Sequence, residues 1–332
     1  MCALMPMVNL SAPVWKTLGL FLIFFDFFLQ CLNISFMTKP NEGQNAPGRE
    51  FQFTVQDFTR ICDLIRRHAG ISLGDSKLDL VYGRLSRRLR ATGIRTFSEY
   101  LQLLERGDQR EWEAFTNALT TNHTAFFREP HHFDLLAEQL RGLKGRAPIV
   151  LWCSAASTGE EPYSMAMAAV DALGSSTPGV VIIATDIDTE VLETARAGIY
   201  PAERVSRLDR ALVQRHFIQD ATVPAGQVRV RPEIRNLVTF RQLNLLQDTW
   251  PIRPPLDAIF CRNVMIYFDR DTQLRILKKF APLLRRDGLL YAGHSERFNH
   301  AEEYFKLQGR TVYEVVPASS SERQGFADGK GR

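Results

Sequence analysis

The sequence predicts an α/β fold, in which a buried parallel sheet follows an all-helical N-terminal region. Residues 149–152 (Ile-Val-Leu-Trp) form a short apolar run with the length and β-branched content of a buried parallel strand. Only small residues follow at 153–159, and an amphipathic segment begins at Glu160. Further apolar runs at 180–185 and 256–260 alternate with helical patterns. Because strands that alternate with helices form βαβ units, we expect a parallel sheet of the nucleotide-binding type.

The composition is that of an ordinary globular chain with enough residues for two domains. Of the 332 residues, 45% are hydrophobic and 23% are charged, and the formal net charge is +4. This mild charge does not by itself indicate a nucleic-acid-binding protein. The five cysteines show no C-x-x-C spacing, which predicts a reduced, cytoplasmic protein without a zinc site.

Residues 1–49 depart from this composition. The run at 18–29 is strongly apolar but contains Asp26, which costs about 2.5–3.5 kcal/mol at a bilayer centre. Either residues 18–36 anchor the protein in a membrane, or translation begins at Met37 and everything before it is an upstream artefact. We favour the second interpretation, because the run is short for a full span and a polar leader follows it.

Residues 50–113 are predicted to form a helical N-terminal domain. Apolar residues recur at helical spacing from 53 to 69, from about 75 to 90 and from 97 to 104. The second of these segments carries arginines at spacings that gather them on one face. They are Arg84, Arg87, Arg88 and Arg90. We expect either a solvated helix face or a dock for an acidic partner surface.

Residues 114–145 are predicted to form a polar linker and a first helix that starts at Pro130. The sheet domain then spans residues 146–316. The remaining tail, residues 317–332, is rich in Ser, Gly and charge, and we expect it to be disordered.

The alternation of strands and helices is interrupted at about residues 198–243. Two runs within this stretch, 227–231 and 237–241, alternate between apolar and polar residues. Such runs are typical of antiparallel strands. We therefore expect a small antiparallel β-subdomain inserted into a crossover of the main sheet.

Polar residues stand where the predicted strands end. Asp186 ends the second strand and Asn263 follows the strand at 256–260, so both face the crevice at the carboxyl edge of the sheet. Asp186 and Asp188 share two roles, accepting hydrogen bonds from ribose hydroxyls and capping the next helix. The turn at 153–159 is not G-x-G-x-x-G, so it does not indicate a pyrophosphate site. Class I S-adenosylmethionine (SAM) methyltransferases need the same close backbone approach without a pyrophosphate.

Three histidines, His123, His131 and His132, lie in the linker and at the start of its helix. No third ligand follows at metal-binding spacing. We expect these side chains to cap or pack, and we expect no metal.

Five long motifs occur in order along the chain. They read AGISLGDSKLDLVYGRLSRRLR, LTTNHTAFFREPHHF, CSAASTGEEPYS, ATDIDTEVLETARAGIY and LDAIFCRNVMIYFDRDTQ. Together they closely resemble the CheR family of chemotaxis receptor methyltransferases, over about residues 50–316. The resemblance implies a class I SAM-dependent methyltransferase sheet, Rossmann-like, with an inserted antiparallel β-subdomain and an all-helical domain before it.

The resemblance also implies a set of site residues. The contacts to SAM are expected from Asn122, Thr124, Arg128, Glu161, Asp186, Asn244, Leu245, Asn263 and Val264. Arg128 and Tyr267 would flank the methyl group and the incoming carboxylate as catalytic residues. The arginine face would then bind the substrate.

The implied reaction is methyl esterification of glutamate side chains on the cytoplasmic methylation helices of membrane chemoreceptors. SAM is the methyl donor and S-adenosylhomocysteine the product, and no strong general base is needed because the acceptor carboxylate, with a pKa of about 4.3, is already ionised. The protein would act in the cytoplasm at membrane receptor arrays, and its β-subdomain would bind a C-terminal tether peptide of the receptor.

Two alternatives stay open, a SAM-binding sensor or adaptor without catalysis and a methyltransferase of a signalling protein outside chemotaxis. A nucleic-acid amine methyltransferase is disfavoured, because the expected Pro-Pro-aromatic run does not follow Asn263.

Overall fold

The computed structural model describes residues 49–317. The predictions for the apolar N-terminal run, for a start at Met37 and for a disordered tail lie outside these residues. The chain divides at residue 54, and the fold below is that of the unit that begins at Val55. Within the described part of the chain, no helix is long and apolar enough to cross a membrane.

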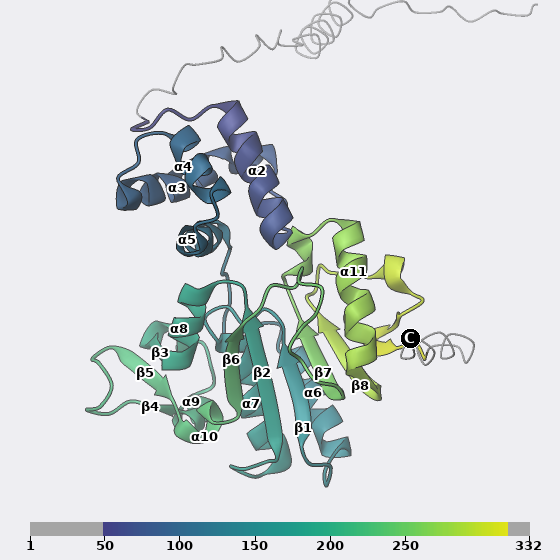
Figure 1. The fold of residues 1–332 in the computed structure, drawn as a ribbon. Helices are drawn as coiled ribbons and strands as arrows, with labels where there is room; N and C mark the ends of the chain where they lie inside the picture. The colour runs from purple at the N-terminus through teal and green to yellow at the C-terminus, as the bar shows by residue number, and fades with distance from the viewer. Residues whose placement is uncertain (1–48, 318–332) are drawn as a thin grey trace, which may run out of the picture. The chain divides into compact units, whose positions relative to one another are not determined.

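The first part of this unit is all-helical, as predicted (Figure 1). Its helices are α2 (Val55–Ala69), α3 (Leu78–Thr92), α4 (Phe97–Glu105) and α5 (Gln109–Leu119). The helix α5 runs past residue 113, where we expected the linker to begin. It does so because Asp108 caps its first turn and Phe115 and Leu119 are buried four residues apart.

The second part is an α/β sheet domain that begins with helix α6 (His131–Gly142). Its sheet has seven strands in the order β6-β2-β1-β7-β8-β10-β9 within the described residues. The pairs β6–β2, β2–β1, β1–β7 and β7–β8 are parallel, whereas β10 pairs antiparallel with both β8 and β9. The strands are β1 (Ile149–Cys153), β2 (Val180–Asp186), β6 (Val238–Gln242), β7 (Leu256–Cys261), β8 (Leu284–Ala292), β9 (Phe305–Gly309) and β10 (Val312–Val315).

Helices cover both faces of this sheet (Figure 1). Besides α6, the domain has the longer helices α7 (Glu160–Leu173), α8 (Thr189–Ala197) and α11 (Arg270–Phe280). Side chains of one strand alternate between two apolar clusters. Leu151 packs in the cluster that contains residues of α6 and α7, and its neighbour Trp152 packs with residues of α11 on the other face. Burial on both faces is the reason that these strands are apolar throughout.

A small antiparallel sheet is present, but its strands differ from those we predicted. Its order is β3-β5-β4, from β3 (Ile199–Pro201), β5 (Gln227–Val230) and β4 (Phe217–Ile218), with the helices α9 (Arg210–His216) and α10 (Pro232–Arg235) beside it in sequence. The predicted pairing of 227–231 with 237–241 is wrong, because β6 pairs parallel with β2 at the edge of the main sheet. In β6, Val238 and Phe240 pack against the core whereas Thr239 and Arg241 are exposed, so its sequence alternates like that of an antiparallel strand.

Candidate active site

One cleft lies at the carboxyl ends of the parallel strands, the position expected for a ligand in an open α/β sheet. Its cavity volume is about 230 Å³. All of the residues predicted to contact SAM line it, and so does Tyr267. They are Asn122, Thr124, Arg128, Glu161, Asp186, Asn244, Leu245, Asn263 and Val264.

Three parts of the chain enclose this cleft. The sheet wall consists of the ends of β1, β2, β6 and β7 with residues that follow them. They lie between Ser154 and Glu161, at Asp186 and Ile187, at Leu243 to Leu245, at Arg262 to Val264, and at Tyr267 and Phe268. The linker contributes residues 119–124 and Arg128. The helical wall consists of the end of α2, the loop behind it and the start of α3, between Ala69 and Leu80.

Asp186 ends β2 and is 9% exposed. Its carboxylate accepts hydrogen bonds from the backbone amide of Ser157 at 2.7 Å and from that of Asp188 at 3.0 Å. Burial raises the pKa of the Asp186 carboxyl to about 6, against the lowering effect of these amides. Asp188 caps helix α8 by accepting from the amides of Glu190 and Val191, so the capping role considered for this acidic pair belongs to Asp188.

Arg262 is the centre of a buried ion-pair network in the sheet wall, and the sequence prediction missed it. Its guanidinium lies 2.6 Å from Glu161 Oε2 and 3.1 Å from Glu129 Oε2, and it also donates to the carbonyl oxygen of Arg128. Burial disfavours the charged form of Arg262, but the two glutamates outweigh this and raise its pKa. The only sequence signal was its place directly after a buried strand.

The two glutamates of this network differ in their environments. Burial raises the pKa of Glu161, which Arg262 only partly offsets. Burial alone would also raise the pKa of Glu129, but Arg262, His294 and Asn263 together lower it to about 2. Glu129 is therefore an ionised anchor between the linker and the residues after β7 and β8.

Arg128 is placed by its neighbours rather than by its own ion pairs. Its carbonyl is held by Arg262, and its Nη1 donates to the carbonyl of His123 at 2.8 Å. The half-buried side chain lines the cleft.

Tyr267 ends a short 3₁₀ helix, Met265–Tyr267, that follows β7. Glu296 holds the start of this segment by accepting from the amides of Asn263 and Met265, both at 2.8 Å. The Tyr267 side chain is half-buried and also lines the cleft, so the segment presents Tyr267 to the same space as Arg128.

The predicted asparagines lie in the cleft but also bond within the protein. Asn122 Nδ2 donates to Asp188 Oδ2 at 2.7 Å, and Asn244 Nδ2 donates to the His68 carbonyl of α2 at 2.7 Å. Asn263 has a positive φ of 58° and donates to Glu129 Oε1 at 3.3 Å. These bonds fix the asparagines at the junctions between the linker, the helical wall and the sheet wall.

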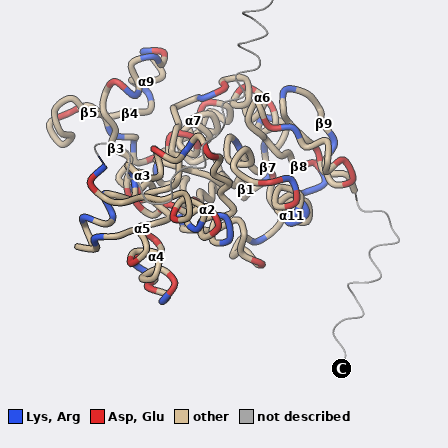
Figure 2. Tube along the Cα trace, turned by 90° about the horizontal axis from the view of Figure 1, so that it is seen from above, with Lys and Arg blue, Asp and Glu red and all other residues tan. Residues whose placement is uncertain are grey.

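The arginines of α3 do not line the cleft, and they do not act as one exposed face. Arg88 pairs with the buried Glu111 at 2.7 Å, and Arg84 donates to the carbonyls of Ala118 and Thr120. Arg87 and Arg90 are exposed. Basic and acidic residues are interspersed along the trace rather than separated into two fields (Figure 2).

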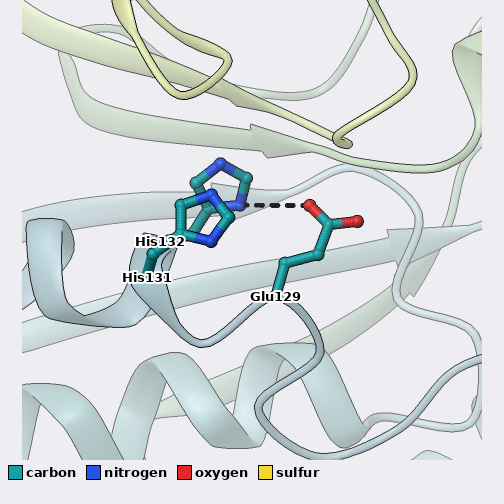
Figure 3. A group of neighbouring side chains, drawn as sticks. All are labelled: Glu129, His131 and His132. Carbon is teal, nitrogen blue, oxygen red and sulfur yellow. Dashed lines mark ion pairs between the residues drawn. The ribbon is translucent and has the colours of Figure 1, made fainter.

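His131, His132 and Glu129 form a group that could hold a metal ion, with ligand atoms within 4.8 Å of one another (Figure 3). The expectation that the histidines lack a third ligand was therefore wrong. His132 is fully buried, and burial with the nearby Arg262 lowers its pKa to about 4. Because Glu129 already pairs with Arg262 and His294, we interpret the group as part of the ion-pair network.

Taken together, the sheet order, the antiparallel β10–β9 hairpin and an acidic residue at the end of β2 define a SAM-dependent methyltransferase of class I. The residues of the cleft fit this ligand, because the carboxylate of Asp186 lines it together with polar residues of the linker and of the segment after β7.

Comparison with known proteins identifies the family. The model of the CheR methyltransferase SAM-binding domain matches residues 122–314, and that of the CheR methyltransferase all-alpha domain matches residues 56–120. Chemotaxis protein methyltransferase 2 of Pseudomonas aeruginosa is 52% identical over 266 residues, which are 80% of this chain and 95% of that protein. The chemotaxis protein methyltransferase of Escherichia coli is 54% identical over 257 residues, 77% of this chain and 89% of that protein. The chain belongs to the CheR methyltransferase family.

Proposed function

We propose that this protein transfers a methyl group from SAM to glutamate side chains of membrane chemoreceptors and forms glutamate methyl esters. The observation that carries the proposal is the gathering of Arg128, Tyr267 and all predicted SAM contacts in one cleft. The relatives named as chemotaxis protein methyltransferases support the substrate class.

In this proposal the sheet wall and the linker bind the donor. Asp186 accepts from the ribose hydroxyls, and Asn244 and Leu245 contact the adenine. Asn122, Thr124, Glu161, Asn263 and Val264 supply the remaining contacts. When bound, SAM supplies an activated methyl group on its sulfonium, which a glutamate carboxylate takes to give the ester and S-adenosylhomocysteine.

Positioning supplies most of the acceleration, because the acceptor carboxylate is already ionised at neutral pH. Arg128 holds that carboxylate through charge-assisted hydrogen bonds, and Tyr267 orients the attacking oxygen. The contacts of Arg128 support this role, since within residues 49–317 its guanidinium donates to a backbone carbonyl and forms no ion pair.

Two surfaces are proposed for the receptor, which the enzyme meets at the cytoplasmic side of the membrane. Arg87 and Arg90 on α3 contact the acidic methylation helices, whereas Arg84 and Arg88 stabilise the helical domain that presents them. The small sheet β3-β5-β4 offers edge strands to which an extended tether peptide can add.

The test is transfer of radiolabelled methyl from SAM to chemoreceptor-containing membranes by the full-length protein. We expect base-labile label on the receptor, and little label with Tyr267→Phe at saturating SAM. SAM binding in calorimetry without any receptor label would instead support a sensor or adaptor, or a methyltransferase of another signalling protein.

A further inference from the structure

The loop behind α2 makes two close contacts with the residue pair Tyr267–Phe268. The helix ends at Ala69, and the amide of Gly70 directly after it donates to the Arg66 carbonyl at 2.8 Å. Two residues later, the amide of Ser72 donates to the carbonyl of Tyr267 at 2.9 Å. This loop therefore contacts the segment that carries a catalytic residue, although it lies almost 200 residues away in the sequence.

The second contact depends on the absence of a side chain at Gly70. Its φ is +74°, and a Cβ atom there would lie 2.8 Å and 2.9 Å from Cδ1 and Cε1 of Phe268. The same atom would lie 3.2 Å from Cδ2 of Leu246. The ring of Phe268 is 9% exposed and packs in the core beneath α11, so it is not free to move aside.

The other anchors of this segment act elsewhere along it. Glu296 holds the amides of Asn263 and Met265, and Gln273 donates to the carbonyls of Met265 and Phe268. Within the described part of the chain, the amide of Ser72 is the donor to the Tyr267 carbonyl. The backbone at Tyr267 is thus held from the helical wall, while its flanks are held from the sheet domain.

We propose that the loop Gly70–Ser72 is a positioning device for Tyr267. Gly70 leaves the space that the Phe268 ring occupies, and the Ser72 amide fixes the carbonyl of Tyr267. The helical domain thereby sets the direction of a catalytic side chain. The inference rests on the proposed function, because it takes Tyr267 as the residue that orients the acceptor.

The first experiment compares two glycine substitutions that share the same backbone strain. Gly174 ends α7 with a φ of +64°, its amide donates to the carbonyl four residues earlier, and a Cβ there would meet nothing within 4 Å. Gly70→Ala should lower kcat by roughly 10- to 100-fold at saturating SAM, since a misplacement of about 1 Å costs about this much. Gly174→Ala should carry the same backbone strain without the steric clash, and it should keep normal kcat.

A rescue variant separates positioning from general damage. In Gly70→Ala, the added change Phe268→Leu removes the ring edge that the new methyl group strikes, so kcat should recover by several-fold. Losses that simply multiply in the double variant would overturn the proposal. Ser72→Pro removes the amide donor without filling the space beside the Phe268 ring, and it should also lower kcat. A normal kcat in this variant would contradict the inference.

Hydrogen exchange provides a readout that does not need the receptor. The amides of Tyr267 and Phe268 donate to Val264 and Met265, and their exchange should accelerate in Gly70→Ala and in Ser72→Pro but not in Gly174→Ala. Unchanged exchange would overturn the positioning role. Absence of receptor labelling by the wild-type protein would instead overturn the proposed function, so the two failures are distinguishable.

Discussion

The sheet wall and the helical wall enclose the same cleft but are held by different interactions. The sheet wall is built around Arg262, which is buried between two carboxylates. The helical wall meets the sheet domain through single contacts, such as the half-exposed ion pair of Arg66 with Asp269 and the bond from Ser72 to Tyr267. Buried ion pairs are strongly destabilised by loss of one partner, whereas exposed pairs contribute little. Substitutions within the buried ion-pair network of the sheet wall should therefore lower the free energy of unfolding. Substitutions of partly exposed cleft residues or of the helical wall should instead lower turnover.

The largest expected effect follows from Arg262→Gln. The variant leaves Glu161 and Glu129 without their shared cation, so the free energy of unfolding should fall by about 3–5 kcal/mol. Urea denaturation measures this. The matched control is Arg146→Gln, which also removes an arginine between two carboxylates, Asp257 and Asp287.

The control should lose much less stability for a structural reason. Arg146 is partly exposed, and the buried Asp257 keeps a second partner in Arg285 at 3.1 Å. Equal losses in the two variants would show that burial of the Arg262 network does not distinguish the sheet wall.

Arg128→Ala should lower turnover strongly and stability little, the reverse of Arg262→Gln. Among the described residues the Arg128 side chain bonds a single carbonyl, that of His123, so the free energy of unfolding should change by less than about 1 kcal/mol. Loss of a charge-assisted bond to the acceptor of roughly 1.5–3 kcal/mol should lower kcat/KM by about 10- to 100-fold. Receptor methylation kinetics test this, and near-normal kcat/KM with normal SAM affinity would remove Arg128 from the reaction.

Most of the sheet could be predicted from the sequence, but its edge could not. The strands β1, β2 and β7 were predicted to within one residue at each end and helix α7 begins at Glu160 as predicted, because buried parallel strands and an amphipathic helix leave strong local signals. The edge strand β6 was misassigned, because its alternation does not reveal its partner. The family resemblance and the fold were confirmed.

The candidate site was partly predictable for a similar reason. Residues that follow strands at the carboxyl edge are recognised by position, and Asp186 and Asn263 do line the cleft. The network of Arg262 with Glu129 and the helical wall were missed, because they depend on contacts between residues more than 100 positions apart. The roles of Asp186 and Asn263 in binding SAM stay predictions.

Ionisation of Asp186 should make SAM affinity depend on pH, an effect smaller than those of the arginine substitutions. The Asp186 carboxyl has a pKa of about 6 in the free protein because it is buried. In the proposed binding mode, ribose hydroxyls donate to the ionised form of Asp186, so binding should release the proton below this pH. Affinity should then be constant above about pH 6 and fall towards tenfold per pH unit below it.

In the free protein, the ionisation of Asp186 should lower folding stability, whereas it strengthens SAM binding. A carboxyl whose pKa is raised on folding binds its proton more tightly in the folded state, so its contribution to stability falls as pH rises from about 4 to about 6. Calorimetry of SAM binding between pH 5 and 7 tests the first effect. Asp186→Asn should bind more weakly and without this pH dependence, and a retained slope would assign it to another group.

The smallest expected effect concerns the outer surface of the helical domain, where Arg87 and Arg90 are exposed on α3. Reversing both charges, Arg87→Glu with Arg90→Glu, should lower kcat/KM for receptor membranes roughly fivefold at low salt, because exposed charges contribute about 0.2–1 kcal/mol each. The loss should shrink as salt screens the surface, while SAM affinity stays unchanged. The control reverses Arg106 and Arg110, which are exposed in the same domain but outside α3. If both double variants lose activity equally, the effect belongs to net charge rather than to a receptor-binding face, and the helical domain would then act on the reaction only through its wall of the cleft.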